Sequence, residues 1–186
     1  IMPSLVGSEM CIRDSAVSAR KGQHNIIKAT PTIIKHYPKF QYHMVGIPKD
    51  KSKLVKLANK LGISSYVNFH GTLSDENLFK HILGSDIFVM LSEEQNDGDV
   101  EGFGIAIIEA NACGIPAIGS KNCGIEDAIS NKYSGLLVDP KDPNKIVNSI
   151  SSILDNYSQY SINAVKWSKS FTWNSIINKY IDAIEN

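Results

Sequence analysis

The sequence has few cysteines, no excess of either charge and no long apolar run, and each of these absences excludes a class of protein. Its three cysteines, Cys11, Cys113 and Cys123, form neither a C-x-x-C pair nor a zinc-ligand spacing with histidine. A disulfide scaffold is therefore excluded, and we expect Cys113 and Cys123 to be small buried apolar residues in a reducing cytoplasm.

The charges are balanced, with 19 basic and 19 acidic residues, so nothing favours nucleic acid or an anionic membrane as a partner. No apolar run approaches the roughly 18 residues of a membrane-spanning helix. The 186 residues, 42% of them hydrophobic, suit one globular domain with a core of its own. We expect a cytoplasmic protein that associates at most peripherally with the inner face of the cell membrane.

Residues 1–15, IMPSLVGSEMCIRDS, show no helical or strand period and no cleavable signal. The stretch LVGSEMCIRDS resembles translated adapter sequence of the kind found in assembled metagenomes. We interpret residues 1–15 as a non-native or irregular segment, the alternative being a genuine irregular N-terminus. The domain is then expected to run from residue 16 to residue 186, C-terminal helices included.

From residue 16 onward, predicted strands alternate with predicted helices. Strands are expected over residues 40–45, 66–69, 86–91, 116–119 and 136–138, and helices over 22–37, 51–61, 75–83, 103–113, 144–154 and 173–184. Repeated β–α units predict an α/β fold with a Rossmann-like, doubly wound parallel sheet, which binds ligands at the carboxyl ends of its strands. The segments R-K-G, H-G-T, E-G-F-G and N-C-G all follow predicted strands, which favours a single site.

The segment over residues 99–116, DVEGFGIAIIEANACGIP, is the most informative for function. Gly102 and Gly104 allow a tight turn and a close approach of a ligand to the backbone. The helix that opens near Phe103 has free N–H groups and a positive dipole end, which suit a phosphate. Eight residues of helix rise roughly 12 Å and rotate about 80° out of register, so Glu101 and Glu109 cannot share one helix face. Glu101 is therefore expected on the loop and Glu109 just over one turn inside the helix, where the two bracket an anionic, hydroxyl-rich ligand such as a nucleotide-sugar.

At this point the sequence resembles a known family. EGFGIAIIEA is similar to the E-x7-E signature of retaining GT-B glycosyltransferases, most closely family 4, which transfer sugars from nucleotide-sugars. The resemblance extends from about residue 17 to the C-terminus, and its other motifs follow in the family's order: RKGQ, HMVG, NFHGTLSDENL, SDIFVMLS, NCGIEDAI and GLLVDP. It implies that this chain is the C-terminal, donor-binding half of a GT-B fold.

The resemblance implies a role for each site residue. Lys21 would pair with the donor diphosphate, and Gly102, Phe103 and Gly104 would offer backbone N–H groups to sugar hydroxyls and phosphate. Glu109 would bind the ribose hydroxyls. The alternative for Lys21 is a solvated lysine at a helix start, and that for Gly102–Gly104 is an ordinary turn. The alternative for Glu109 is an exposed helix glutamate. Arg20 is expected at the surface.

Glu101 is the catalytic candidate. By resemblance it would face the transferred sugar and the positive charge that develops at the anomeric carbon, without having to act as a nucleophile; capping of the helix dipole is the rival role. Gly71, Thr72 and Leu73 resemble the loop that lines the nucleotide base, the alternative being a plain turn after a strand.

The N-terminal segment also bears on the site. Family members carry a strand there that ends in G-R-L, and the place of its phosphate-binding arginine falls near Ser15. We therefore expect that ligand to be missing and the first strand of the sheet to be damaged.

No cofactor and no metal is expected, since GT-B enzymes generally work without one. The acidic residues Glu93, Glu94, Asp97 and Asp99 lack the alternating ligand spacing of a calcium loop and are interpreted as a solvated, mobile loop. The longer loop ending in GDVEGFG is similar to members that use GDP-mannose on lipid or polysaccharide acceptors.

The remaining candidates are interpreted as structural. The five histidines, at positions 24, 36, 43, 70 and 81, show no shared ligand spacing, and only His70 is placed at a site edge, where a core or capping role is favoured. Trp167, Phe171 and Trp173 are interpreted as packing anchors near the C-terminus.

The expected partners are a UDP- or GDP-linked sugar and a glycan or lipid acceptor held by a second, N-terminal domain that this sequence does not contain. We therefore expect a chain that recognises the donor but transfers no sugar by itself. The rivals are a non-catalytic fragment that only binds the donor and a GT-B-fold nucleotide-sugar epimerase. A dinucleotide-binding module is disfavoured because no G-x-G-x-x-G follows a first strand.

Overall fold

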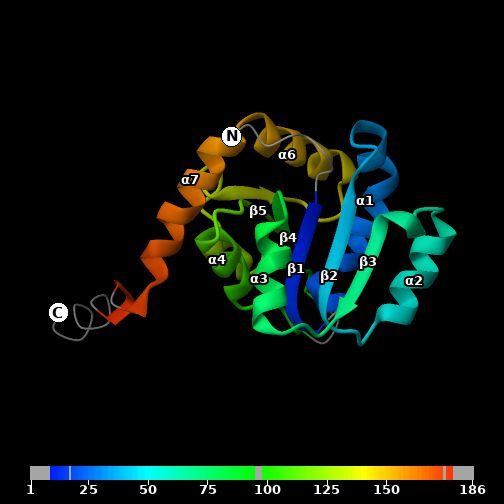
Figure 1. Ribbon diagram of the computed structural model, residues 1–186, viewed down its shortest axis with the longest axis horizontal. Coiled ribbons are helices and arrows are strands. Elements are labelled where there is room, and N and C mark those ends of the chain that lie inside the picture. The colour runs from blue at the N-terminus through cyan, green and yellow to red at the C-terminus, as the bar shows by residue number, and fades with distance from the viewer. Residues whose placement is uncertain (1–8, 17, 95–97, 174, 178–186) are drawn as a thin grey trace.

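A computed structural model describes residues 9–16, 18–94, 98–173 and 175–177 of the chain. Within these residues the strands form one parallel sheet in the order β3-β2-β1-β4-β5-β6 (Figure 1). The strands are β1 (Glu9–Ala16), β2 (Gln41–Ile47), β3 (Val67–Gly71), β4 (Ile87–Met90), β5 (Ala117–Ser120) and β6 (Gly135–Val138). The α-helices are α1 (Gln23–His36), α2 (Lys51–Lys60), α3 (Asp75–Leu83), α4 (Ile105–Ala112), α5 (Ile125–Ala128), α6 (Pro143–Asp155) and α7 (Tyr157–Ser168).

Helices cover both faces of the sheet, which confirms the predicted doubly wound α/β architecture. One apolar cluster joins α1, α2 and α6 to side chains such as Tyr42 and Val89. A second joins α3, α4 and α5 to alternate positions of the same strands, including Val45, Phe88 and Met90. Because β4 is buried on both faces, its sequence is continuously apolar, as a covered parallel strand requires.

The N-terminal segment differs from expectation from Glu9 onward. Residues 9–16 form β1, which pairs with β2 on one side and with β4 on the other. Glu9–Ala16 is therefore a paired strand, not the irregular or damaged segment expected, while residues 1–8 lie outside the described part. The physical reason is that β2 and β4 both need a hydrogen-bonding neighbour between them, and this pairing overrides a weak local pattern. That residues 1–15 are non-native stays a prediction.

Most other elements lie within two residues of their predicted bounds, and Ser74 caps α3 as expected, its Oγ accepting a hydrogen bond of 3.4 Å from the Asn77 N–H. Helices α5 and α7 were not predicted. Only four residues form α5, and α7 is rich in serine, asparagine and glutamine, so its apolar stripe is weak. The predicted helix over residues 173–184 falls largely outside the described residues.

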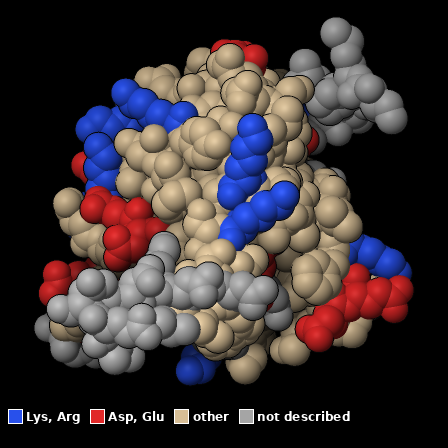
Figure 2. Space-filling model, turned by 90° about the vertical axis from the view of Figure 1, so that its left-hand side faces the viewer, with Lys and Arg blue, Asp and Glu red and all other residues tan. Residues whose placement is uncertain are grey.

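The surface agrees with the balanced composition. Figure 2, viewed from the side that carries α7, shows acidic and basic side chains singly or in small groups on a largely uncharged face. Cys113 and Cys123 are half-buried free thiols rather than fully buried residues. In the described part of the chain, no helix has the length and apolarity to cross a bilayer.

We expect Ile12→Pro to unfold the domain, because it removes a backbone N–H from a strand that is paired along both edges. Ile12→Val, which preserves strand propensity, should shift the free energy of unfolding by no more than about 1 kcal/mol. Urea denaturation followed by far-ultraviolet circular dichroism measures both. A stable, cooperatively folded Ile12→Pro protein would show that this segment is not part of the sheet.

Candidate functional site

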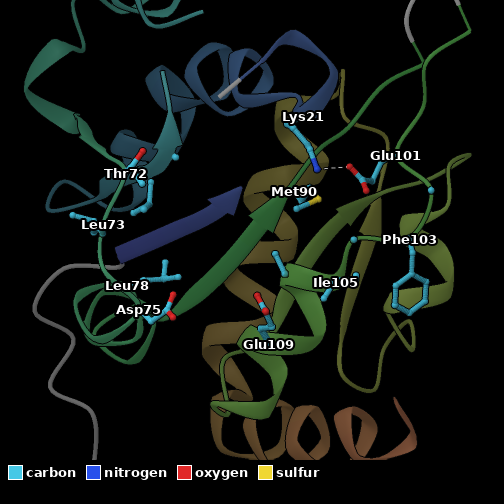
Figure 3. Close-up of a pocket in the computed structure, with 15 residues that line it drawn as sticks. Lys21, Thr72, Leu73, Asp75, Leu78, Met90, Glu101, Phe103, Ile105 and Glu109 are labelled. Carbon is cyan, nitrogen blue, oxygen red and sulfur yellow. Dashed lines mark hydrogen bonds and ion pairs between the residues drawn. The ribbon is translucent and has the colours of Figure 1, made fainter. Parts of the chain in front are cut away.

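The strand order reverses direction between β1 and β4, and a pocket lies beside this switch point. The chain runs outward from β1 to β2 and β3, returns through α3 to β4 on the other side of β1, and then runs outward to β5 and β6. This reversal leaves a crevice at the carboxyl ends of the strands. The cavity has a volume of about 730 Å³, within the range of small-molecule sites. It is lined by Lys21, Val45, Gly46, Thr72, Leu73, Asp75, Leu78, Met90, Glu101, Gly102, Phe103, Gly104, Ile105, Ala106 and Glu109 (Figure 3).

Lys21 is held at the switch point by a close backbone contact. It ends a 3-10 turn (Ala19–Lys21), and Gly22 then begins α1 with a left-handed φ of 71°. A Cβ atom at Gly22 would lie 1.6 Å from the Leu91 carbonyl oxygen, so a glycine is required there. The loop after β1 therefore lies directly against the end of β4. Lys21 is 6% exposed and lines the pocket.

Lys21 and Glu101 form an ion pair within this pocket. The Lys21 ammonium donates to Oε2 of Glu101, and Figure 3 shows the two side chains pointing toward one another. Arg20 Nη1 contacts the same Oε2 at 3.2 Å, and Arg20 Nε lies 3.2 Å from Oδ2 of Asp99. Arg20 is therefore half-buried in an ion cluster, and the expectation of a simple surface residue is wrong. Its role was missed because its acidic partners are some 80 residues away in the sequence.

The E-G-F-G turn positions the start of α4 at the pocket. Gly104 is the N-cap with a left-handed φ of 87°, and no side chain caps the helix. The helix begins at Ile105, two residues later than predicted, and its first N–H groups have no partner within the helix. Backbone donors and the positive end of the helix dipole therefore lie at the pocket wall.

Gly124 packs closely against the backbone of the E-G-F-G turn. The Gly124 N–H donates to the Glu101 carbonyl at 3.0 Å, and a Cβ atom at Gly124 would lie 2.0 Å from the Gly102 carbonyl oxygen. The N-C-G segment after β5 thus lies against the backbone that carries Glu101. Its contribution is to hold the turn in place rather than to line the pocket.

Glu109 enters the pocket from α4, and the β3–α3 connection forms another wall. Glu109 is the fifth residue of α4 and is half-buried, so it stands just over one turn inside the helix as predicted. Figure 3 places its carboxylate below Met90, with Thr72 and Leu73 across the opening. Gly71 does not line the pocket; its left-handed φ of 69° turns the chain at the end of β3.

Aromatic contacts join the E-G-F-G turn to the C-terminal helix. The rings of Phe103 and Phe171 lie 5.4 Å apart, and Phe171 packs edge-on against Trp167 at 5.2 Å. The Trp167 indole N–H donates to the Ala128 carbonyl at 2.9 Å. Trp167 and Phe171 are packing anchors, as predicted. Trp173 is 80% exposed, so that expectation is wrong for Trp173 in the described structure.

Glu93, the first residue of the acidic loop that precedes the E-G-F-G turn, is held in place by side-chain contacts. Glu93 accepts a hydrogen bond from the Asn25 side chain and lies near His24 and Lys141. Burial raises the pKa of Glu93, but the hydrogen bond from Asn25 and the charges of Lys141 and His24 outweigh it, and the pKa is lowered overall. The expectation of a solvated loop is wrong for Glu93, whereas Glu94 is exposed. Asp99 pairs with Arg20, and Asp97 lies outside the described residues.

The structure thus brings eight of the predicted site residues to one pocket, Gly71 being the exception; their roles in binding remain predictions. The pocket combines a buried cation, the carboxylates of Asp75, Glu101 and Glu109, and backbone donors at a helix start. Cations and helix N-termini suit phosphate, and carboxylates suit hydroxyl groups. These features define a Rossmann-like domain with a pocket at its switch point whose side chains suit an anionic, hydroxyl-bearing ligand.

Comparison with known proteins identifies the family. The family model described as "Glycosyl transferases group 1" matches residues 14–169, and the chain belongs to this family. The chain is 34% identical over 144 residues to a GDP-mannose-dependent monoacylated alpha-(1-6)-phosphatidylinositol monomannoside mannosyltransferase of Corynebacterium glutamicum, an alignment that covers 77% of this chain and 37% of that protein. It is 30% identical over 147 residues to a D-inositol 3-phosphate glycosyltransferase of Corynebacterium urealyticum, covering 75% and 33%. The chain therefore spans about a third of the length of these relatives.

Solved structures show the same fold. The chain matches sucrose-phosphate synthase from Thermosynechococcus elongatus with a TM-score of 0.78 and 23% identity, over 98% of this chain and 46% of that one. It matches Anabaena HepE in complex with UDP and glucose with a TM-score of 0.76 and 22% identity, over 97% and 48%. The C-terminal domain of a glycosyl transferase group 1 family protein (LpcC) from Francisella tularensis matches with a TM-score of 0.71 and 21% identity, over 88% and 85%. The fold is that of the C-terminal half of a GT-B glycosyltransferase, as predicted.

We expect Gly124→Ala to lower the free energy of unfolding by about 1–3 kcal/mol, because its Cβ meets rigid backbone. Gly102→Ala is the matched control: a Cβ there meets nothing within 4 Å, so the change should stay within about 0.5 kcal/mol. Urea titrations of both variants measure the difference. Equal stability of the two would contradict a supporting role for Gly124.

Proposed function

We propose that this chain is the donor-binding part of a retaining glycosyltransferase that transfers a sugar from a nucleotide-sugar to a glycan or lipid acceptor. The observation that carries the proposal is the convergence of Lys21, Glu101, Glu109 and the start of α4 on one pocket at the switch point. A nucleotide-sugar presents groups that match these: a diphosphate for the cation and the helix start, and hydroxyls for the carboxylates. Membership of the glycosyl transferases group 1 family supports this assignment.

The arrangement of the pocket suggests how the donor lies. Thr72 and Leu73 stand on one side, Lys21 and Glu101 on the other, and Glu109 between them in the view of Figure 3. We assign the nucleotide base to the Thr72–Leu73 wall, the ribose to Glu109, the diphosphate to Lys21 and the α4 start, and the transferred sugar to Glu101. Gly71 would act only by turning the chain into this wall.

In the catalytic step the residues at the switch point would stabilise the departing diphosphate. Lys21 and the backbone N–H groups at Phe103–Ile105 neutralise the charge that develops on the leaving group, the largest contribution a fixed site of this kind makes. Arg20, which contacts the Glu101 carboxylate at 3.2 Å, would add a second cation at the rim. Glu101 would stabilise positive charge at the anomeric carbon, while the acceptor hydroxyl attacks on the face that the diphosphate leaves.

We propose GDP-mannose as the donor. The Corynebacterium glutamicum relative is named as GDP-mannose-dependent, as are relatives from Mycobacterium tuberculosis and Mycolicibacterium smegmatis at 30% identity. The Anabaena structure with the same fold holds UDP and glucose, so UDP-glucose is the competing donor to test.

We further propose that acceptor binding needs a region outside this chain, so that the chain by itself binds the donor without transferring its sugar. Turnover by the purified chain with a glycan or lipid acceptor would contradict this last point.

We expect the purified chain to bind GDP-mannose with a Kd of about 1 mM or tighter, and Lys21→Ala to weaken binding at least about tenfold through loss of a charge-assisted contact. Lys80→Ala is the matched control, since Lys80 is 67% exposed on α3 and pairs with Glu76 outside the pocket. Isothermal titration calorimetry with GDP-mannose, UDP-glucose and NADH measures these affinities. Preferential binding of NADH, or equal affinity of the Lys21 variant and the control, would refute the proposal.

Glu101→Gln should separate the diphosphate from the sugar. The substitution removes a carboxylate that competes with phosphate for Lys21, so GDP alone should bind as well as to the original chain or better. The same variant should lose most of the preference for GDP-mannose over GDP, because that carboxylate faces the sugar in our assignment. The readout is the ratio of the two dissociation constants. An unchanged ratio would show that Glu101 does not contact the sugar.

A further inference from the structure

Three histidines that are far apart in the sequence lie together on one face of the sheet. His43 lies on β2, His70 at the end of β3 and His81 on α3, and each is half-buried. One ring nitrogen from each lies within 4.8 Å of the other two. The ring centroids of His70 and His81 are 4.3 Å apart, and those of His43 and His70 are 5.1 Å apart.

The fold brings these rings together through an irregularity of the sheet. Met44 opposes Phe69, but Val45 opposes Gly71, so the register between β2 and β3 shifts at His70. A bulge of this kind redirects the side chain of the extra residue. It leaves His70 near His43, whose Nδ1 lies 2.8 Å from Nε2 of His70.

This part of the sheet face is polar, unlike the apolar surface around it. Along β2, buried Tyr42 and Met44 alternate with half-buried Gln41 and His43. Gln41 accepts a hydrogen bond of 2.8 Å from Asn68 on β3, so the polar positions form a strip next to the histidines. A polar strip of this kind contributes little to an apolar core. Helix α3 packs beside it and adds the third imidazole, that of His81.

The chemical state of the rings favours lone-pair donation. Burial lowers the pKa of His43, and the nearby His81 lowers it further. Burial likewise lowers the pKa of His70, with added repulsion from His81 and His43. Both shifts favour the neutral imidazole, which is the form that binds a metal ion.

We propose that His43, His70 and His81 form a binding site for a divalent transition-metal ion, with Zn²⁺ as the ion that three imidazoles suit. A tetrahedral Zn²⁺ has Zn–N distances of about 2.0–2.1 Å, which places its ligand nitrogens roughly 3.4 Å apart. Nδ1 of His43 lies 2.8 Å from Nε2 of His70, and one nitrogen from each of the three rings lies within 4.8 Å of the others, so side-chain rotations can bring the three nitrogens to this spacing. The half-exposed setting leaves a fourth position for water, and imidazole ligands disfavour Mg²⁺ and Ca²⁺.

The site is separate from the nucleotide-sugar pocket. None of the three histidines lines that pocket, and none of the acidic residues of the pocket takes part. The ion would join β2, β3 and α3, and the neighbouring Val45, Thr72 and Leu78 line the pocket above it. Its contribution is therefore structural, as a link between the edge of the sheet and α3.

Zinc titration of protein prepared without a polyhistidine tag tests the proposal. We expect one Zn²⁺ per chain with a Kd on the order of 10 μM or tighter, and a rise of a few degrees in the melting temperature at saturating metal. Co²⁺ should give the visible absorption of a four-coordinate site without a thiolate charge-transfer band, which excludes the cysteines. Mg²⁺ in large excess should not displace the ion.

His70→Ala and His81→Ala should each weaken Zn²⁺ binding by on the order of tenfold or more. The control is His36→Ala, which changes an exposed histidine at the end of α1 and should leave Zn²⁺ affinity unchanged. His81→Asn serves as a second variant if His81→Ala disturbs folding. The proposal is overturned by absence of saturable Zn²⁺ binding, by thiolate bands with Co²⁺, or by equal affinity of the His81 and His36 variants.

Discussion

The close approach of Gly22 to the carbonyl of Leu91 is the contact on which the site depends. The loops after β1 and β4 meet at the switch point, and a side chain at Gly22 would hold them apart. At Gly22 a Cβ would lie 1.6 Å from that carbonyl oxygen. The contact brings Lys21 beside Glu101, and Gly124 holds the Glu101 turn in the same way from the other side.

Around this packed backbone the site balances opposite charges at short range. Lys21, Arg20, Glu101 and Asp99 form a cluster in which every charge has a partner before any ligand arrives. An anionic ligand would therefore have to compete with Glu101 for the lysine, so in the donor arrangement proposed above, binding of the diphosphate would release the Glu101 carboxylate. The Phe103–Phe171 contact connects this turn to the C-terminal helical segment, so the site is braced by residues nearly 70 positions away.

Local patterns in the sequence predicted most elements, because they are local properties. The Ser74 cap, the acids in the first turn of α3 and the continuous apolar run of β4 each require only neighbouring residues. The placement of Glu101 on a loop and Glu109 inside α4 followed from helix rise and rotation alone. Strand β1 was missed because its pairing with β2 and β4 outweighs its own weak period, and α7 because its apolar stripe is sparse.

By itself the sequence determined the alternation of strands and helices, the glycines that permit close turns, and the family to which the motifs belong. Only the tertiary structure decided which side chains meet. The ion pairs of Arg20, the anchoring of Glu93 and the assembly of His43, His70 and His81 join residues that lie far apart in the sequence. Such contacts depend on strand order and on a register shift of one residue between β2 and β3, and no spacing along the chain encodes them.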